Sequence, residues 1–243
     1  MLLMPVQGYD MFYKTFVDNK NEISVANKLR RQRFRIFLDM IEGLDRPIQI
    51  LDIGGRPGFW EMMFSEFDIK DDLFITLVNI EKHNISSTNI QSVTGDARDL
   101  SQFADQQSDI VFSNSTIEHV GDYDDQHRMA QEVKRLGKRY FIQTPNKFFP
   151  IEPHFAFPLF QFLPVSMRAW LAHNFAMGWR TNPIEDYQAA VDEVSSIRLL
   201  SQNEFQHLFP ESNIYQEKYL GLNKSFVAYT QTANYRATNL VNV

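Results

Sequence analysis

Two histidines, each close to a glutamate, are the side chains of this sequence best suited to moving a proton. His119 directly follows Glu118, and His154 lies two residues after Glu152. Imidazole has a pKa near neutrality, so it is the usual general base for a hydroxyl group, whose own pKa is far higher. Each histidine also has a structural interpretation: His119 bonded to backbone at the start of a helix, and His154 fixing a proline-rich loop.

A glycine-rich turn is the second feature with chemical meaning. The apolar run Ile48–Ile53 contains one acid, Asp52, and leads into the sequence Gly-Gly-Arg-Pro-Gly at positions 54–58. Glycines let a backbone approach a ligand closely, and the helix expected after the turn presents unpaired N–H groups at its N-terminus. An acid inside a buried strand needs a partner. The stretch therefore predicts a site for a nucleotide-type ligand.

Alternating strands and helices must position these residues. Short apolar runs bounded by turn residues predict strands at Ile48–Ile53, Leu73–Ile80, Asn89–Thr94, Asp109–Ser113 and Tyr140–Thr144. Strands that alternate with helices form a parallel sheet with right-handed crossovers, whose carboxyl ends line one crevice.

The end of the chain departs from this alternation. Two strand-like segments, Ile214–Leu220 and Ser225–Thr230, predict an antiparallel hairpin, and Ser201 with Glu204 predicts a helix cap before it. The expected fold class is α/β: a Rossmann-like, doubly wound and mostly parallel sheet with a C-terminal antiparallel hairpin, an N-terminal helix and a helical insertion after the fifth strand.

The expected domain organisation follows these changes of pattern. Residues 1–46 form an N-terminal helical segment, with a helix over 9–43. Residues 47–231 form the main domain, which carries an insertion rich in Phe and Pro at 147–184, and residues 232–243 form a polar tail. Helical periodicity also predicts helices over 124–136 and 185–194.

Composition excludes several classes of protein. The chain has 243 residues, 44% of them hydrophobic, and a net charge of -6, which argues against a general nucleic-acid binder. It has no Cys, which excludes disulfides and thiolate metal sites and fits a cytoplasmic protein. No apolar stretch reaches the length of a membrane span, although peripheral membrane contact stays open. The oligomeric state is not indicated.

The glycine turn lacks the Gly-x-Gly-x-x-Gly spacing of nicotinamide dinucleotide sites, so a dehydrogenase is the least favoured interpretation. The chain resembles instead the class I S-adenosylmethionine-dependent methyltransferases, from about residue 48 to residue 230. The resemblance rests on motifs in the family's order, with Arg56 as a departure where the family has glycine. These motifs are Asp52–Gly58, Asn79–Glu81, Gly95–Ala97, Ser113–Val120 and the final hairpin.

The resemblance implies S-adenosylmethionine as cofactor and a role for each matching residue. Gly54, Gly55 and Gly58 would form the turn against the methionine part, and Asp52 would hold its ammonium group. Asp96 would accept a hydrogen bond from the adenine amino group, with the Ala97 N–H donating to the ring. Ser113 or Asn114 would offer a backbone carbonyl to the ammonium. The ribose hydroxyls would be held by Glu81 or by Asn79, and both remain open.

The resemblance also implies chemistry at the acceptor. His154 and His119 would be the catalytic residues, with His154 favoured as the base because its loop should cover the acceptor. Some O-methyltransferases bind a divalent cation through Glu-x-x-Glu-His, but this chain has Ser115 at the first position of that motif. We therefore expect no bound metal, while Glu118, His119, Glu152 and His154 stay an alternative site.

The expected function is O-methylation of a small-molecule, sugar or glycolipid hydroxyl by in-line displacement. The segment from Gln143 to Phe155 is similar to bacterial methyltransferases found among glycan-building enzymes, which favours a glycan acceptor. Two alternatives remain: a non-catalytic, methyltransferase-like binding module in which Arg56 alters the cofactor site, and a metal-dependent RNA O-methyltransferase.

Overall fold

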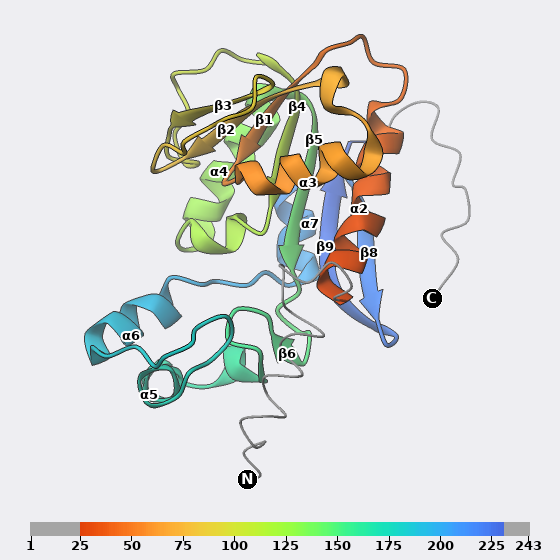
Figure 1. The fold of residues 1–243 in the computed structure, drawn as a ribbon. Helices are drawn as coiled ribbons and strands as arrows, with labels where there is room; N and C mark the ends of the chain where they lie inside the picture. The colour runs from red at the N-terminus through yellow and green to blue at the C-terminus, as the bar shows by residue number, and fades with distance from the viewer. Residues whose placement is uncertain (1–24, 231–243) are drawn as a thin grey trace.

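The computed structural model describes residues 25–230. A central sheet, rich in β-branched and aromatic residues, runs through it (Figure 1). The sheet has seven strands. They are β1 (Ile48–Ile53), β2 (Leu73–Asn79), β3 (Ile90–Thr94), β4 (Ser108–Asn114), β5 (Gly137–Pro145), β8 (Asn213–Tyr219) and β9 (Leu222–Tyr229).

The strand order is β3-β2-β1-β4-β5-β9-β8. The first five strands of this order are parallel, whereas β9 is antiparallel to both β5 and β8. The order reverses between β1 and β4, and such a switch point opens a ligand crevice at the carboxyl ends of the strands. The predicted mostly parallel sheet with a C-terminal antiparallel hairpin is confirmed.

Helices cover both faces of this sheet. Phe34, Phe37 and Trp60 pack one face, whereas Met129 and Phe205 belong to the cluster on the other. The covering helices are α2 (Val25–Ile41) and α3 (Pro57–Phe67) on the first face, and α4 (Tyr123–Leu136) and α7 (Gln202–Leu208) on the second. Short 3-10 turns join these elements: η1 (Lys70–Asp72), η2 (Ile117–His119) and η3 (Phe160–Phe162).

The segment after β5 builds a second, smaller hydrophobic core. Figure 1 shows it beyond the carboxyl end of β5. Its elements are β6 (Ile151–Glu152), β7 (Phe157–Pro158), η3, α5 (Val165–Asn174) and α6 (Tyr187–Ser195). Phe155 and Phe160 stack at 4.3 Å and share one cluster with Ala190 and Val194 of α6. The packing of this insertion thus continues past the expected boundary at residue 184.

The element bounds differ from the sequence-based ones by a few residues. β2 ends at Asn79, whose carbonyl accepts the last hydrogen bond from the β3 side, Gly95 N; the chain then bends and leaves Ile80 exposed. The expected helix over 9–43 is described only from Val25 to Ile41, and its earlier part lies outside the described residues, as does the tail. The predicted capping box of Ser201 and Glu204 is confirmed.

Candidate active site

The turn after β1 is packed so closely that side chains are excluded from it. Gly54 has φ +78°, and a Cβ there would lie 2.2 Å from Thr116 Oγ1. A Cβ on Gly55 would lie 1.8 Å from Asp52 Oδ2. Both glycines are therefore required by the space around them, as well as by backbone conformation at Gly54. The turn brings bare backbone to the switch point between β1 and β4.

Asp52 is buried below this turn and is incompletely satisfied. Its Oδ2 accepts a hydrogen bond of 2.7 Å from the indole N–H of Trp60, but Oδ1 has no partner among the described residues. Burial raises the pKa of Asp52 to about 7, despite the indole hydrogen bond that lowers it. An ammonium group would satisfy the second oxygen and keep the carboxylate ionised. The residues present therefore fit the amino-acid end of S-adenosylmethionine.

Arg56, the departure from the family pattern, is exposed to solvent. It is the N-cap residue of α3. Its positive charge is the smallest of the influences that lower the pKa of His119.

The two candidates for holding a ribose have different surroundings. The Asn79 amide donates to the Gly55 carbonyl at 2.8 Å, so this side chain braces the glycine turn. Glu81 lies two residues beyond the end of β2 and is exposed. Asn79 is thus occupied in the turn, while the carboxylate of Glu81 reaches solvent.

The other cofactor candidates also occupy the carboxyl ends of the strands. Ser113 is buried and donates to the Ile53 carbonyl at 2.8 Å, which ties β4 to β1. Asn114 Oδ1 accepts from Arg33 at 3.3 Å. Gly58 lies in the first turn of α3, where a Cβ would meet nothing within 4 Å, so packing gives no reason for glycine there.

Asp96, expected beside an adenine, is engaged by its neighbour. Arg98 donates to both carboxylate oxygens, at 2.9 Å and 2.6 Å, and holds the pKa of Asp96 below its usual value. Ala97 follows at the end of β3 and is half-buried. A cofactor that used the Asp96 carboxylate would share it with Arg98.

The structure brings His119 and His154 together. The Nε2 atoms of the two rings are 3.1 Å apart, and the rings meet nearly at right angles. His119 ends η2 after β4, and His154 follows β6, so the pair joins the main domain to the insertion. Glu152 orients the His154 ring: its Oε1 lies 2.6 Å from Nδ1, while its Oε2 accepts from Phe155 N.

These contacts drive the pKa values of the two rings apart. Desolvation and the neighbouring His154 lower the pKa of His119 to about 4, although the residue is partly open to solvent. Burial acts in the same direction on His154, but its hydrogen bond to Glu152 and the Glu152 charge outweigh burial and raise its pKa. Any extra proton on the pair therefore resides on His154.

Glu118 lies beside the pair and is fully buried. Its Oε2 accepts from Thr144 Oγ1 at 3.1 Å, while Oε1 has no partner in the described part of the chain. Burial raises the pKa of Glu118 to about 7. One ligand atom from each of Glu118, His119 and His154 lies within 4.8 Å of the other two. These three are the residues that can hold a metal ion here.

Sequence reasoning missed the segment that lies against His154. Gly178 has φ +63°, and a Cβ there would lie 1.9 Å from the His154 carbonyl oxygen. The next residues, Trp179 and Arg180, line an open crevice of about 450 Å³ together with Glu193 of α6. The Glu193 charge reaches both histidines. The local signal in the sequence was a glycine before a tryptophan, and contact with His154 cannot be predicted from that.

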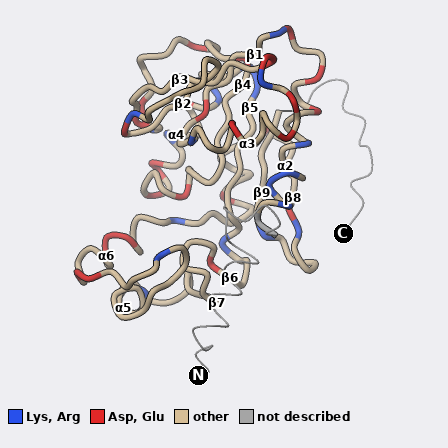
Figure 2. Tube along the Cα trace, viewed as in Figure 1, with Lys and Arg blue, Asp and Glu red and all other residues tan. Residues whose placement is uncertain are grey.

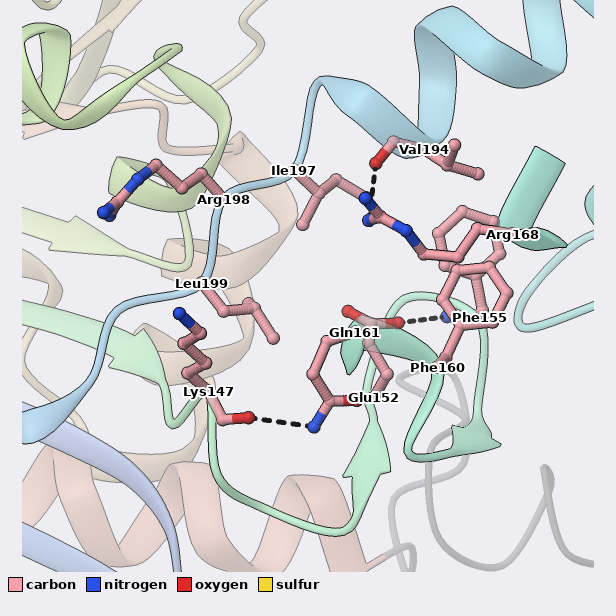
Figure 3. Close-up of a pocket in the computed structure, with 10 residues that line it drawn as sticks. All are labelled: Lys147, Glu152, Phe155, Phe160, Gln161, Arg168, Val194, Ile197, Arg198 and Leu199. Carbon is pink, nitrogen blue, oxygen red and sulfur yellow. Dashed lines mark hydrogen bonds between the residues drawn. The ribbon is translucent and has the colours of Figure 1, made fainter. Parts of the chain in front are cut away.

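A second cavity, of about 190 Å³, borders Glu152 on the insertion side (Figure 3). The rings of Phe155 and Phe160 form its apolar wall, and Arg168 reaches across it to donate to the Val194 carbonyl at 3.0 Å. Arg168 Nε is buried and without a hydrogen-bond partner among the described residues. Glu152 thus lies between the histidine pair and this cavity.

The central part of the chain is similar to known proteins. The sequence profile of the family described as "Methyltransferase domain" matches residues 63–140. Curated relatives are two proteins of Mycobacterium tuberculosis strains, both called uncharacterized and each 37% identical over 57 residues. That alignment covers 24% of this chain and 20% of the relatives' length.

Solved structures are similar in fold. A possible exported protein from Bordetella parapertussis is 12% identical with a TM-score of 0.51, over 96% of this chain and 75% of that one. A SAM-dependent methyltransferase from Aquifex aeolicus is 12% identical with a TM-score of 0.47, over 83% of this chain and 95% of that one.

Within residues 25–230, none of the helices combines the length and apolarity needed to cross a lipid bilayer. The strand order, the glycine turn over a buried acid and the profile match across residues 63–140 agree with one another. Residues 63–140 match the methyltransferase-domain family, and the strand order is that of the class I methyltransferase fold.

Proposed function

We propose that this protein transfers the methyl group of S-adenosylmethionine to a hydroxyl group of a small-molecule, sugar or glycolipid acceptor. The observation that carries the proposal is the histidine pair. His119 and His154 face each other at 3.1 Å beside the carboxyl ends of β4 and β5, where the fold opens its crevice.

The cofactor half of the proposal rests on the switch point. Gly54 and Gly55 expose backbone to the methionine part, and the unpaired oxygen of Asp52 receives its ammonium group. Ser113 keeps β1 and β4 in register beside it. Glu81 is the better candidate for the ribose hydroxyls, because its exposed carboxylate can accept from both of them, whereas Asn79 offers a single acceptor oxygen. The Ala97 N–H and the Asp96 carboxylate remain the candidates for adenine.

The acceptor half rests on proton chemistry. The bound cofactor supplies an activated methyl carbon, so the protein's tasks are to align the acceptor, exclude water and remove the hydroxyl proton. His154 is suited to the last task because Glu152 binds its Nδ1 and stabilises the ring when it gains a proton. His119 contacts the His154 ring from η2 and helps to fix the orientation of that ring.

The crevice lined by Trp179, Arg180 and Glu193 suits a hydroxylated acceptor. Trp179 offers an exposed ring with the Arg180 guanidinium 4.4 Å from its centre, and Glu193 bonds Arg180 at 2.8 Å. An aromatic face next to charged hydrogen-bonding groups is the arrangement that sugar rings and other polyols require. The similarity of residues 143–155 to glycan-associated methyltransferases supports the same class.

Cofactor binding is the first test. Calorimetry should detect 1:1 binding of S-adenosylmethionine to the full chain, and Gly54→Ala should abolish it because the new Cβ meets Thr116. Gly43→Ala is the matched control: Gly43 has φ +77°, nearly that of Gly54, but a Cβ there meets nothing within 4 Å. Absence of binding at millimolar cofactor would sink the proposal and favour a non-catalytic module.

Methyl transfer is the second test. The protein is incubated with methyl-labelled S-adenosylmethionine and fractions of bacterial extract enriched in soluble sugars, glycolipids or RNA. A labelled product that carries a new O-methyl group is the expected result. Label that appears only in RNA, or on nitrogen or carbon, would contradict the proposed acceptor class while leaving cofactor binding intact.

A further inference from the structure

The two histidine rings point the same type of atom at each other. Their Nε2 atoms are 3.1 Å apart, and the rings meet at 88°. Two imidazole nitrogens bound to one tetrahedral ion at about 2.05 Å would lie about 3.3 Å apart, so the observed separation is close to that of two ligands of one cation. A hydrogen bond between the rings explains this distance equally well, and a further observation must separate the two.

Glu118 supplies that observation. Its carboxylate is fully buried, and Oε1 has no hydrogen-bond partner among the described residues. A buried carboxylate oxygen without a partner is costly, and a hydrogen bond between the two histidines does nothing to satisfy it. A cation shared by Glu118, His119 and His154 would satisfy it, because their ligand atoms lie within 4.8 Å of one another.

The surroundings of His154 are those of a metal ligand. Glu152 Oε1 binds Nδ1 at 2.6 Å, which leaves Nε2 free to present a lone pair toward His119 and Glu118. A carboxylate on the far nitrogen of an imidazole is the usual support for a ligating histidine. Glu152 is itself held by Phe155 N at 2.8 Å, so the orientation of the ring is fixed by two elements of the insertion.

We propose that Glu118, His119 and His154 form a binding site for a divalent transition-metal ion. Two imidazoles and one carboxylate select zinc, manganese, iron, cobalt or nickel over magnesium or calcium, which prefer oxygen ligands alone. Three protein ligands leave at least one coordination position open, as in catalytic metal sites. This proposal departs from the sequence-based expectation of no bound metal.

The consequence for turnover rests on the proposed function. A hydroxyl at the open position loses its proton to water more readily. Its oxygen then forms the new O–CH₃ bond as the S–CH₃ bond breaks, with the bonding pair left on sulfur. With an ion bound, the two histidines would act as ligands, and the ion would supply the activation of the acceptor hydroxyl. Metal binding itself does not depend on methyl transfer.

The binding test uses tag-free full-length protein, stripped of metal by a chelator. Calorimetry with zinc, manganese or cobalt chloride should show one saturable site, with magnesium chloride at least about tenfold weaker. Cobalt binding should also produce a visible absorption band from an imidazole-ligated ion. Absence of a saturable 1:1 site for all three transition metals would overturn the proposal.

Variants locate the site. His119→Ala and Glu118→Gln should each abolish the saturable binding, and Glu152→Gln should weaken it about 10- to 100-fold. His207→Ala is the matched control, because His207 is an exposed histidine on α7, outside this cluster. Circular dichroism and binding of S-adenosylhomocysteine check that each variant is folded. Unchanged metal binding in both His119→Ala and Glu118→Gln would also overturn the proposal.

The two proposals fail in different ways. Methyl transfer that persists in chelator, by a protein without a saturable metal site, would refute the metal site and leave the O-methyltransferase proposal standing. A 1:1 metal site lost in His119→Ala, in a protein that transfers no methyl group, would uphold the metal site and refute the proposed function.

Discussion

The buried carboxyl group of Asp52 should make cofactor binding depend on pH. Its pKa of about 7 results from burial, which outweighs the hydrogen bond from Trp60. Near neutral pH this carboxyl therefore exists in both forms when no cation is beside it. Only the ionised form attracts an ammonium group.

Cofactor affinity should accordingly fall as the pH drops below 7. Between pH 7 and pH 6 the ionised fraction of a group with a pKa of 7 falls about fivefold, and the affinity for S-adenosylhomocysteine should fall by the same factor. Calorimetry at the two pH values measures this. Asp52→Asn should bind more weakly and lose the pH dependence, and a dependence that survives in this variant would assign it to another group.

His154 is the residue on which turnover should depend most. His154→Ala should lower kcat by about 100-fold or more, because the acceptor loses the group that activates it, whether the ring takes the proton or holds an ion. Initial rates with labelled S-adenosylmethionine measure the effect. His207→Ala should keep the parent rate. An unchanged rate in His154→Ala would mean that His119 activates the acceptor, or that no histidine does.

The elements around the site explain why this pair forms. β4 and β5 run parallel, so η2 and the start of the insertion leave the sheet at the same edge. The insertion then turns back, and Gly178 touches the backbone of His154. The position of one histidine therefore depends on a loop 24 residues further along the chain.

Two glycines with positive φ test this dependence. Gly178→Ala should destabilise the protein by more than about 2 kcal/mol and lower turnover at least about tenfold, because its Cβ would displace the His154 backbone. Gly221→Ala should cost only about 1 kcal/mol and leave turnover unchanged, since a Cβ there meets nothing within 4 Å in the β8–β9 turn. Urea unfolding and initial rates provide the readouts. Equal effects of the two variants would contradict the contact.

At the scale of the whole molecule, a buried ion pair joins the first described helix to the last hairpin. Arg33 of α2 donates to Glu217 of β8 at 2.5 Å, with both side chains buried. Lys224 of β9 lies 3.6 Å from the same carboxylate. Figure 2 shows basic residues on α2 and on both hairpin strands. The charges of Arg33 and Lys224 both act on the Glu217 carboxylate.

Glu217→Gln should therefore lower the free energy of unfolding by about 3–5 kcal/mol, because it leaves buried cations without their counter-charge. Glu66→Gln, which removes the exposed pair with Arg31, should change it by less than about 1 kcal/mol. Urea unfolding measures both. A loss in Glu217→Gln no larger than that in Glu66→Gln would show that the pair contributes little.

The same pair gives stability a pH dependence. Burial pushes the pKa of Glu217 upward, but Arg33 and Lys224 outweigh burial and hold it below the usual value. A lowered folded-state pKa means that the stabilisation is complete above the ordinary glutamate pKa and is lost as the pH falls through the folded-state value. Glu217→Gln should flatten this acid slope.

The sequence predicted the elements and their order because their signals are local. Apolar periodicity marked the strands, and the sequence of positions 54–58 marked a turn that only glycine permits at Gly54. The capping box at Ser201 was equally local. The same patterns led to the sheet class and to the resemblance to methyltransferases, since that resemblance consists of short motifs in a set order.

The contacts that make a site depend on distances that no local pattern encodes. His119 and His154 are 35 residues apart, and Arg33 and Glu217 are 184 apart. Whether two such side chains meet depends on strand register, on helix packing and on how the insertion turns back. Local preference put each residue at the end of its element, and packing across the sheet set which atoms face each other.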